Sequence, residues 1–158
     1  MQMPNEPIVG IDLDNTIIDY QELFYTIAFR SGLIDKGFPK DKQQIRDFLR
    51  SKDGGEDDWQ RLQSKVYGEE IQSAELFDKV TDFFQRCKQR HIPVYIVSHK
   101  TRYPGRGKKT DLRKAAIAFL EKKGFFSDGL IQRDQVYFEA TRKEKIERRC
   151  KRIVKYFP

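Results

Sequence analysis

Cysteine is scarce in this sequence, and no apolar run approaches the length that a membrane-spanning helix needs. The two cysteines, Cys87 and Cys150, are isolated from each other, so they predict neither a disulfide framework nor a zinc site. The N-terminus lacks the basic and then apolar pattern of a secretory signal. We therefore expect a cytoplasmic protein with no membrane partner. Internal repeats and low-complexity tracts are also absent, and the sequence indicates no oligomeric state.

Charge is abundant and unbalanced. Of 158 residues, 35% are charged, and the formal net charge is +7 at pH 7. The 12 Phe and 7 Tyr are too many for a disordered chain, and the length suits one domain or one core with a small insert. A positive balance suits an anionic ligand, and phosphate esters and nucleic acid both qualify. Solubility together with a missing acidic segment accounts for the balance equally well.

Three short apolar segments predict the strands of a parallel sheet, namely residues 7–13, 92–98 and 135–139. Helical patterns separate these segments, which indicates an α/β fold. The expected fold class is a three-layer α/β/α Rossmann-like parallel sheet with a small helical cap insert, C-terminally truncated. The core would comprise residues 1–17 and 73–158, and the insert would comprise residues 18–72.

The insert is expected to be helical because three helical patterns occur in it, separated by glycine-containing breaks. These patterns cover residues 18–31, 41–51 and 57–67, and the core is expected to add helices over residues 73–90, 110–123 and 141–154. The helix over 73–90 carries Val80, Phe83, Phe84 and Cys87 at helical spacing, so we interpret Cys87 as a core thiol. Three aromatic residues of the insert either face a substrate or, as we favour, pack in its own core: Phe24, Trp59 and Tyr67.

The strongest chemical signal is the run Asp12-Leu13-Asp14-Asn15-Thr16 at the end of the first predicted strand. Residues two apart on a strand point to the same side, so Asp12 and Asp14 converge at the carboxyl edge of the sheet, where α/β folds bind ligands. Two adjacent carboxylates repel each other, and a hard cation such as Mg²⁺ relieves that repulsion. Because the pattern is short, a strand that simply ends in an acidic turn is the alternative.

A hydroxyl and a lysine provide two weaker signals. Ser98 ends the second predicted strand, where it is able to donate a hydrogen bond to a phosphoryl oxygen; its alternative role is to cap a turn or helix. Lys143 and Lys145 lie near the start of the last predicted helix, where the helix N-terminus and an ammonium group both favour an anion. Most basic residues of that helix are expected to be solvated, and the residues alone do not choose between Lys143 and Lys145.

Taken together, these residues resemble the haloacid dehalogenase-like (HAD) superfamily of phosphohydrolases, and in particular an uncharacterised bacterial branch of it. The resemblance rests on the Asp12-x-Asp14 strand end, the strand that ends in Ser98 and the helix-start lysine. It covers most of the chain, with the insert in the place of the family's helical cap. The stretches 96–101 and 137–141 are the most similar to that branch.

The resemblance implies a magnesium-dependent phosphomonoester hydrolase. Asp12 would attack phosphorus and form an aspartyl-phosphate, while Asp14 would act first as a general acid and then as a general base. Ser98 and the lysine, with Lys145 favoured by local resemblance, would hold the phosphoryl oxygens. Mg²⁺ would bind the Asp12 carboxylate and the Asp14 backbone carbonyl, and the Thr16 hydroxyl would fix the turn. A small phosphorylated metabolite is the expected substrate, because a cap of this kind closes over a small molecule.

The sequence departs from the family after the last predicted helix. Family members carry a fourth motif there, in which one or two acids on a following strand complete the magnesium site. Here no Asp or Glu follows Glu147. We expect this to reflect truncation just before the fourth motif.

Three other functions are compatible with parts of the sequence. A degenerate, non-catalytic family member kept for binding would also lack the fourth motif. A receiver-type phosphoacceptor is disfavoured, because its aspartate lies on a middle strand, where this chain has Ser98. A nucleic-acid end-processing phosphatase or a nucleic-acid-binding module is indicated by the density of basic residues at Lys100, Arg102, Arg106, Lys108, Lys109, Arg113 and Lys114.

We predict that the 158-residue chain binds Mg²⁺ weakly and has low or absent phosphatase turnover, because the acids of the fourth motif are missing from it. Calorimetric titration with MgCl₂ and a phosphatase assay measure the two properties. Tight Mg²⁺ binding together with brisk turnover would contradict this prediction.

Overall fold

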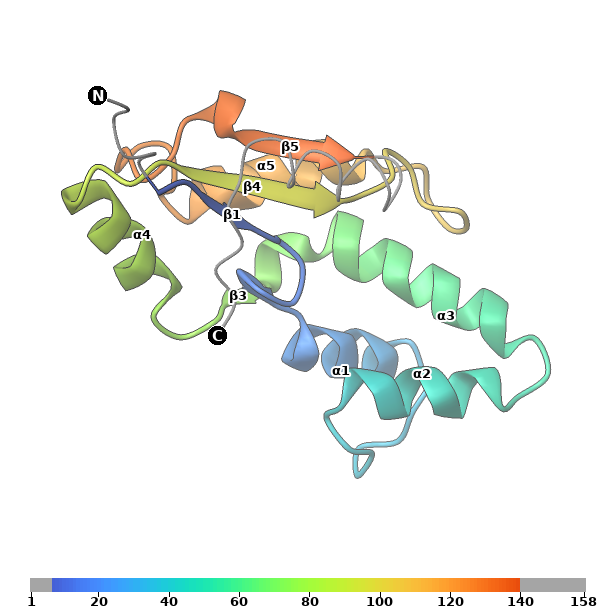
Figure 1. Cartoon of the computed structure of the whole chain (residues 1–158). Coiled ribbons are helices and arrows are strands. Elements are labelled where there is room, and N and C mark those ends of the chain that lie inside the picture. The colour runs from blue at the N-terminus through green and yellow to red at the C-terminus, as the bar shows by residue number, and fades with distance from the viewer. Residues whose placement is uncertain (1–6, 140–158) are drawn as a thin grey trace. The chain divides into compact units, whose positions relative to one another are not determined.

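The computed structural model describes residues 7–139 of the chain. Figure 1 shows the strands and helices of these residues, in which three successive helices follow the first strands and the later strands and helices alternate. The predicted helix over 141–154 lies outside the described residues, as do Lys143, Lys145 and Cys150. None of the helices within 7–139 is both long and apolar enough to cross a membrane.

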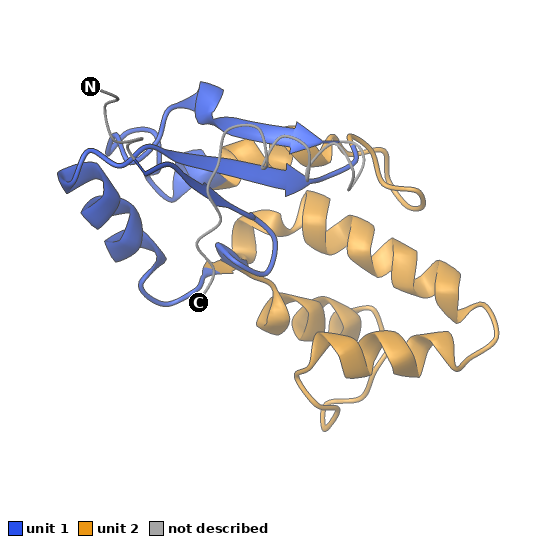
Figure 2. Cartoon of the chain, viewed as in Figure 1, with its two compact units in different colours: residues 1–18, 76–101, 120–158 blue, residues 19–75, 102–119 orange. Residues whose placement is uncertain are grey.

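The chain forms two compact units (Figure 2). Within the described residues, unit 1 comprises 7–18, 76–101 and 120–139, and unit 2 comprises 19–75 and 102–119. Residues 102–119, which the sequence analysis placed with the core, therefore group with the helical insert. That the insert serves as a cap stays a prediction.

Unit 1 contains a parallel sheet of three strands in the order β1-β4-β5. The strands are β1 (Val9–Ile11), β4 (Val94–His99) and β5 (Val136–Glu139). Strands β1 and β5 lie within predicted segments, and β4 extends one residue beyond the predicted segment 92–98. The central strand is the most apolar, and Val94, Ile96 and Val97 are buried. In the register, Ile11 is opposite Ile96 and Ser98 is opposite Phe138. The predicted α/β class with a parallel sheet is thus confirmed.

Unit 2 is built largely from three helices, α1 (Gln21–Arg30), α2 (Lys42–Arg50) and α3 (Gly55–Ser64). The Asp41 side chain accepts a hydrogen bond from the Gln44 backbone and so begins α2. A π-helical segment, Lys65–Glu69, and a 3₁₀ turn, Ile71–Ser73, follow α3. Phe24 and Trp59 are buried and stack with ring centroids 5.3 Å apart, so these two aromatics form core rather than substrate contacts.

Two predicted helices begin later than the sequence pattern indicates. Residues 18–19 form β2 (Ile18–Asp19) and residues 75–76 form β3 (Glu75–Leu76), which pair as a two-stranded sheet. Helix α4 consequently spans only Val80–Gln89 of the expected 73–90. The local pattern is helical, but long-range pairing of these short strands prevails over it, as tertiary contacts commonly do.

The inner face of α4 was predicted largely correctly. Phe84 and Cys87 are buried, and burial raises the pKa of the Cys87 thiol, which suits a neutral core group. Phe83 is 38% exposed, so the helical stripe of Val80, Phe83, Phe84 and Cys87 is not buried along its whole width. The remaining helix, α5 (Leu112–Lys122), begins after Asp111, whose carboxylate accepts hydrogen bonds from the backbone of Arg113 and Lys114.

Candidate functional site

The carboxyl ends of β1 and β4 lie at the same end of the sheet. These strands are parallel neighbours, and Ile11 is paired with Ile96. Residues that follow Ile11 therefore emerge beside residues that follow Ile96 (Figure 1). The acidic turn after β1 and the end of β4 are both in unit 1, so one structural unit holds all the described candidate residues.

A tight turn holds the two aspartates. Leu13 accepts backbone hydrogen bonds from Ile17 and Ile18, and the N–H of Asn15 donates to Ile18 at 3.0 Å. Asn15 has a positive φ of 59°, a conformation that asparagine tolerates better than most residues. Leu13 and Ile17 are fully buried and anchor the turn. The aspartates are therefore displayed on a backbone whose path is well defined.

The expected function of Thr16 is not seen in the described residues. Within 7–139 the Thr16 hydroxyl forms no hydrogen bond, and backbone hydrogen bonds close the turn instead. Asp12 is oriented by a different contact, because its Oδ1 accepts a hydrogen bond from the Leu13 N–H at 2.8 Å. This bond restricts rotation of the carboxylate that the sequence analysis assigned as nucleophile.

Lys100 pairs with Asp14 across the two strand ends. Its Nζ lies 2.8 Å from Asp14 Oδ2, and the Lys100 side chain is only 4% exposed, while that of Asp14 is 20% exposed. The backbone N–H of Lys100 donates to the Glu139 carbonyl at 3.1 Å, which ties the lysine to the end of β5. A lysine is rarely buried to this extent without a charged partner. The acidic turn and β4 are thus joined by an ion pair of low exposure.

Sequence reasoning placed Lys100 among the basic loop residues and missed this position. The available signal was its spacing from Ser98, since residues two apart at a strand end share a side. Three of the other basic residues also have carboxylate partners, all within unit 2: Arg102 with Asp111 at 3.0 Å, Arg106 with Asp57 at 3.2 Å and Lys108 with Glu69 at 3.4 Å. These pairs reduce the positive charge that the loop offers to nucleic acid.

Ser98 supplies a buried hydroxyl that has no hydrogen-bond partner among the described residues. The side chain is 1% exposed, and its Oγ is inaccessible to water. Buried polar atoms nearly always have a partner, and leaving one unsatisfied costs about 1–3 kcal/mol. A ligand that accepts a hydrogen bond at the carboxyl end of β4 would remove that cost.

The oxygen ligands at this site suit Mg²⁺ better than a metal ion that needs three or more protein side chains as ligands. Within residues 7–139 no group of three or more His, Cys, Asp or Glu side chains is placed to hold a metal ion. Magnesium needs less, because it is commonly bound by one or two carboxylates together with water and substrate phosphate. The Asp12 carboxylate and the Asp14 backbone carbonyl would supply that minimal set.

The chain matches no protein-family model, and no curated protein matches it in sequence. The assignment of a function therefore depends on the geometry of these residues.

We predict that Asp14 and Lys100 are energetically coupled. The free energy of unfolding, measured by chemical denaturation, is compared in wild type, Asp14→Asn, Lys100→Met and the double variant. Each single change leaves a poorly solvated partner behind, so the double variant should be more stable than additivity predicts by about 1–3 kcal/mol.

The matched control is the Glu121–Arg133 pair in the same unit, whose side chains are more than half exposed. Its coupling should not exceed about 0.5 kcal/mol, as for most surface pairs. Equal coupling in the two cycles would show that the Asp14–Lys100 contact is an ordinary surface pair.

Proposed function

We propose that this protein is a magnesium-dependent phosphomonoester hydrolase that uses Asp12 as its nucleophile. The observation that carries the proposal is the Asp14–Lys100 ion pair at the carboxyl end of β4, two residues along the chain from the buried, unpartnered hydroxyl of Ser98. Transfer of a phosphoryl group needs a nucleophile and hydrogen-bond donors for the phosphoryl oxygens. The two carboxylates, the ammonium group and the hydroxyl near these strand ends provide both kinds of group.

The proposed chemistry has two halves and is the one that the family resemblance implies. An oxygen of Asp12 attacks phosphorus, the ester P–O bond breaks, and the leaving oxygen takes a proton from Asp14. In the second half, Asp14 accepts a proton from water, which attacks the aspartyl-phosphate and releases inorganic phosphate. Bound Mg²⁺, held by Asp12 and Asp14, would offset negative charge on the transferring group.

Lys100 and Ser98 serve the phosphoryl oxygens. An ammonium group has three donor hydrogens, so an ion pair with Asp14 does not prevent a bond to a phosphoryl oxygen as well. The Ser98 hydroxyl would donate to a second oxygen. The helix-start lysine, Lys145 or Lys143, is proposed as a further phosphate contact on the family resemblance.

We also propose the finer architecture that this function implies. Strands β4 and β5 are parallel neighbours joined through α5, which is the usual crossover arrangement of α/β folds. The three strands would then form the centre of a three-layer Rossmann-like core, and the helical insert would cap it. A small phosphorylated metabolite is the proposed substrate, since the ion pairs of the basic loop leave less charge for nucleic acid.

Replacement of the nucleophile tests this proposal. Hydrolysis of p-nitrophenyl phosphate with Mg²⁺ should fall to background in Asp12→Asn, because an amide cannot form the phosphoenzyme. The matched control is Asp78→Asn, an exposed position in unit 1, which should keep wild-type turnover. Turnover above background that is equal in wild type and Asp12→Asn would eliminate Asp12 as nucleophile.

Ser98→Ala should separate function from stability. Removing an unsatisfied buried hydroxyl should leave the free energy of unfolding unchanged or raise it by about 1 kcal/mol. Turnover should nevertheless fall about 100-fold, the usual effect of losing one donor to a developing charge. Ser127→Ala, which removes an exposed hydroxyl of unit 1, is the control for both measurements. A Ser98→Ala variant with full turnover would remove Ser98 from the site.

A further inference from the structure

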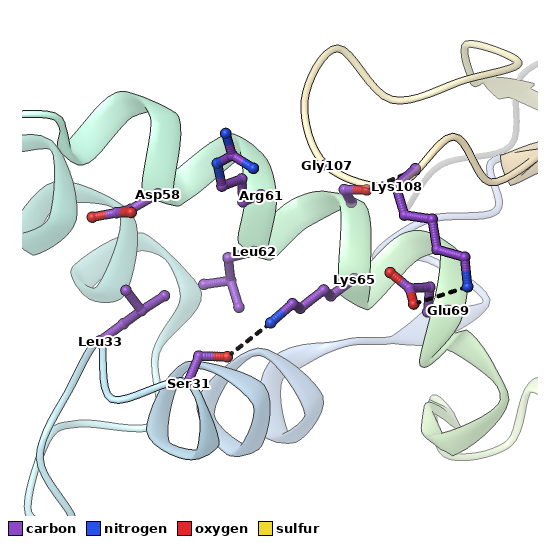
Figure 3. A pocket seen from close by; sticks show the side chains of 10 residues that line it. Ser31, Leu33, Asp58, Arg61, Leu62, Lys65, Glu69, Gly107 and Lys108 are labelled. Atoms are coloured by element: carbon purple, nitrogen blue, oxygen red, sulfur yellow. Dashed lines mark hydrogen bonds and ion pairs between the residues drawn. The ribbon is translucent and has the colours of Figure 1, made fainter.

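We propose that unit 2 contains a separate binding site for a small zwitterionic molecule, whose cationic end contacts Asp58 and whose anionic end contacts Lys65. The proposal is independent of the phosphohydrolase function, because it rests on residues of unit 2 alone. The site is a pocket of about 510 Å³, a volume typical of small-molecule sites. Figure 3 shows its lining, to which α3, the loop after α1 and the loop around Gly107 contribute.

Charged and apolar side chains alternate along one wall of the pocket. Asp58, Leu62 and Lys65 follow one another at spacings of four and three residues, so they share a face of α3 and its C-cap. Asp58 and Lys65 are two turns apart, or about 10 Å along the helix axis. Leu62 lies between them, and Leu33 lines the pocket as well. The ligand would therefore have an apolar middle between two charged ends.

The charges at the two ends lack carboxylate or ammonium partners among the described residues. The Asp58 carboxylate accepts no hydrogen bond and forms no close ion pair there, and the nearby Arg61 guanidinium, which acts on it electrostatically, is already paired with Asp57. Among the described residues, the Lys65 ammonium group donates only to the Ser31 hydroxyl, at 3.3 Å (Figure 3). Neighbouring charges are satisfied, since Asp57 pairs with Arg61 and Glu69 pairs with Lys108. The two unpaired charges are opposite in sign and lie at opposite ends of Leu62.

The backbone around the pocket is unusual in two places. Lys65 begins the π-helical segment Lys65–Glu69, and π-helical turns are rare and frequently occur at functional sites. Gly107 has a φ of +86°, and a Cβ at this position would lie 2.9 Å from Ser64 Oγ. Only glycine lets the loop approach α3 so closely. The wall formed by this loop is therefore part of the folded unit.

The presence of Asp58 decides between ligand classes. A purely anionic ligand would gain from Lys65 but would be repelled by the carboxylate two turns away, and a purely cationic ligand would meet the reverse problem. A zwitterion satisfies both ends. The ligand class that fits is a molecule with an amine and a carboxylate or phosphate separated by a hydrocarbon segment.

Three probes of equal chain length test the charge pattern: 8-aminooctanoate, octanedioate and 1,8-diaminooctane. Each is titrated into the full chain by calorimetry and by amide NMR. We expect 8-aminooctanoate to bind at least ten-fold more tightly than the other two, with shift changes at Leu62 and Gly107. Failure of 8-aminooctanoate to bind at millimolar concentration, or equal binding of all three probes, would overturn the proposal.

Variants test the assignment of each end. Asp58→Asn and Lys65→Met should each weaken 8-aminooctanoate binding at least ten-fold. The matched controls, Asp53→Asn and Lys36→Met, change exposed residues of unit 2 outside the pocket and should leave binding unchanged. Thermal unfolding confirms that all four variants are folded. Unchanged binding in either Asp58→Asn or Lys65→Met would overturn the proposal, whatever the result of the phosphatase assays.

Discussion

A lysine that is almost wholly buried requires a carboxylate beside it, and the contact between Lys100 and Asp14 is the interaction on which the candidate site depends. The 2.8 Å pair joins the end of β4 to the turn that follows β1. The parallel register of Ile11 with Ile96 makes this contact possible, because it brings both strand ends to one edge. Once Asp14 is held there, the short turn leaves Asp12 little freedom in position.

The buried Ser98 hydroxyl lowers the stability of the fold, because no described residue forms a hydrogen bond with it. A buried hydroxyl without a partner lowers stability, and an alanine would fill nearly the same space without that loss. Polar groups retained against stability are frequent at sites that bind a ligand, where stability and function oppose each other. Lys100 and Ser98 both carry hydrogen-bond donors, and the proposed phosphoryl transfer uses both of them together with the aspartates.

The positions of the sheet strands and most of the candidate residues at their carboxyl ends could be predicted from the sequence. The strands are apolar runs bounded by turns, so their positions needed only local information. Asp12, Asp14 and Ser98 follow from where those strands end. The role of Lys100 could not be predicted, because it stands in a run of similar basic residues and its partner is distant in the chain. The late starts of α1 and α4 have the same origin, since β2 and β3 are distant in sequence and form only by pairing with each other.

In unit 2, the pairing of charged side chains matters more for ligand recognition than their number. The net charge of +7 suited an anionic ligand without choosing between phosphate esters and nucleic acid, yet several of the cations in unit 2 are held by neighbouring carboxylates. What matters for recognition is which charges lack a partner, and in the pocket these are Asp58 and Lys65. Composition alone gives the balance of charge, whereas only the fold distinguishes paired from unpaired groups.

The central claim is that Asp12 accepts a phosphoryl group at the edge shared by Ser98 and Lys100. Its most direct test is ¹⁹F NMR of beryllofluoride, a phosphoryl mimic that binds to an aspartate carboxylate, because the measurement does not depend on turnover. With millimolar Mg²⁺, the account predicts protein-bound fluoride resonances in the wild type and none in Asp12→Asn. Identical bound resonances in both proteins would contradict it.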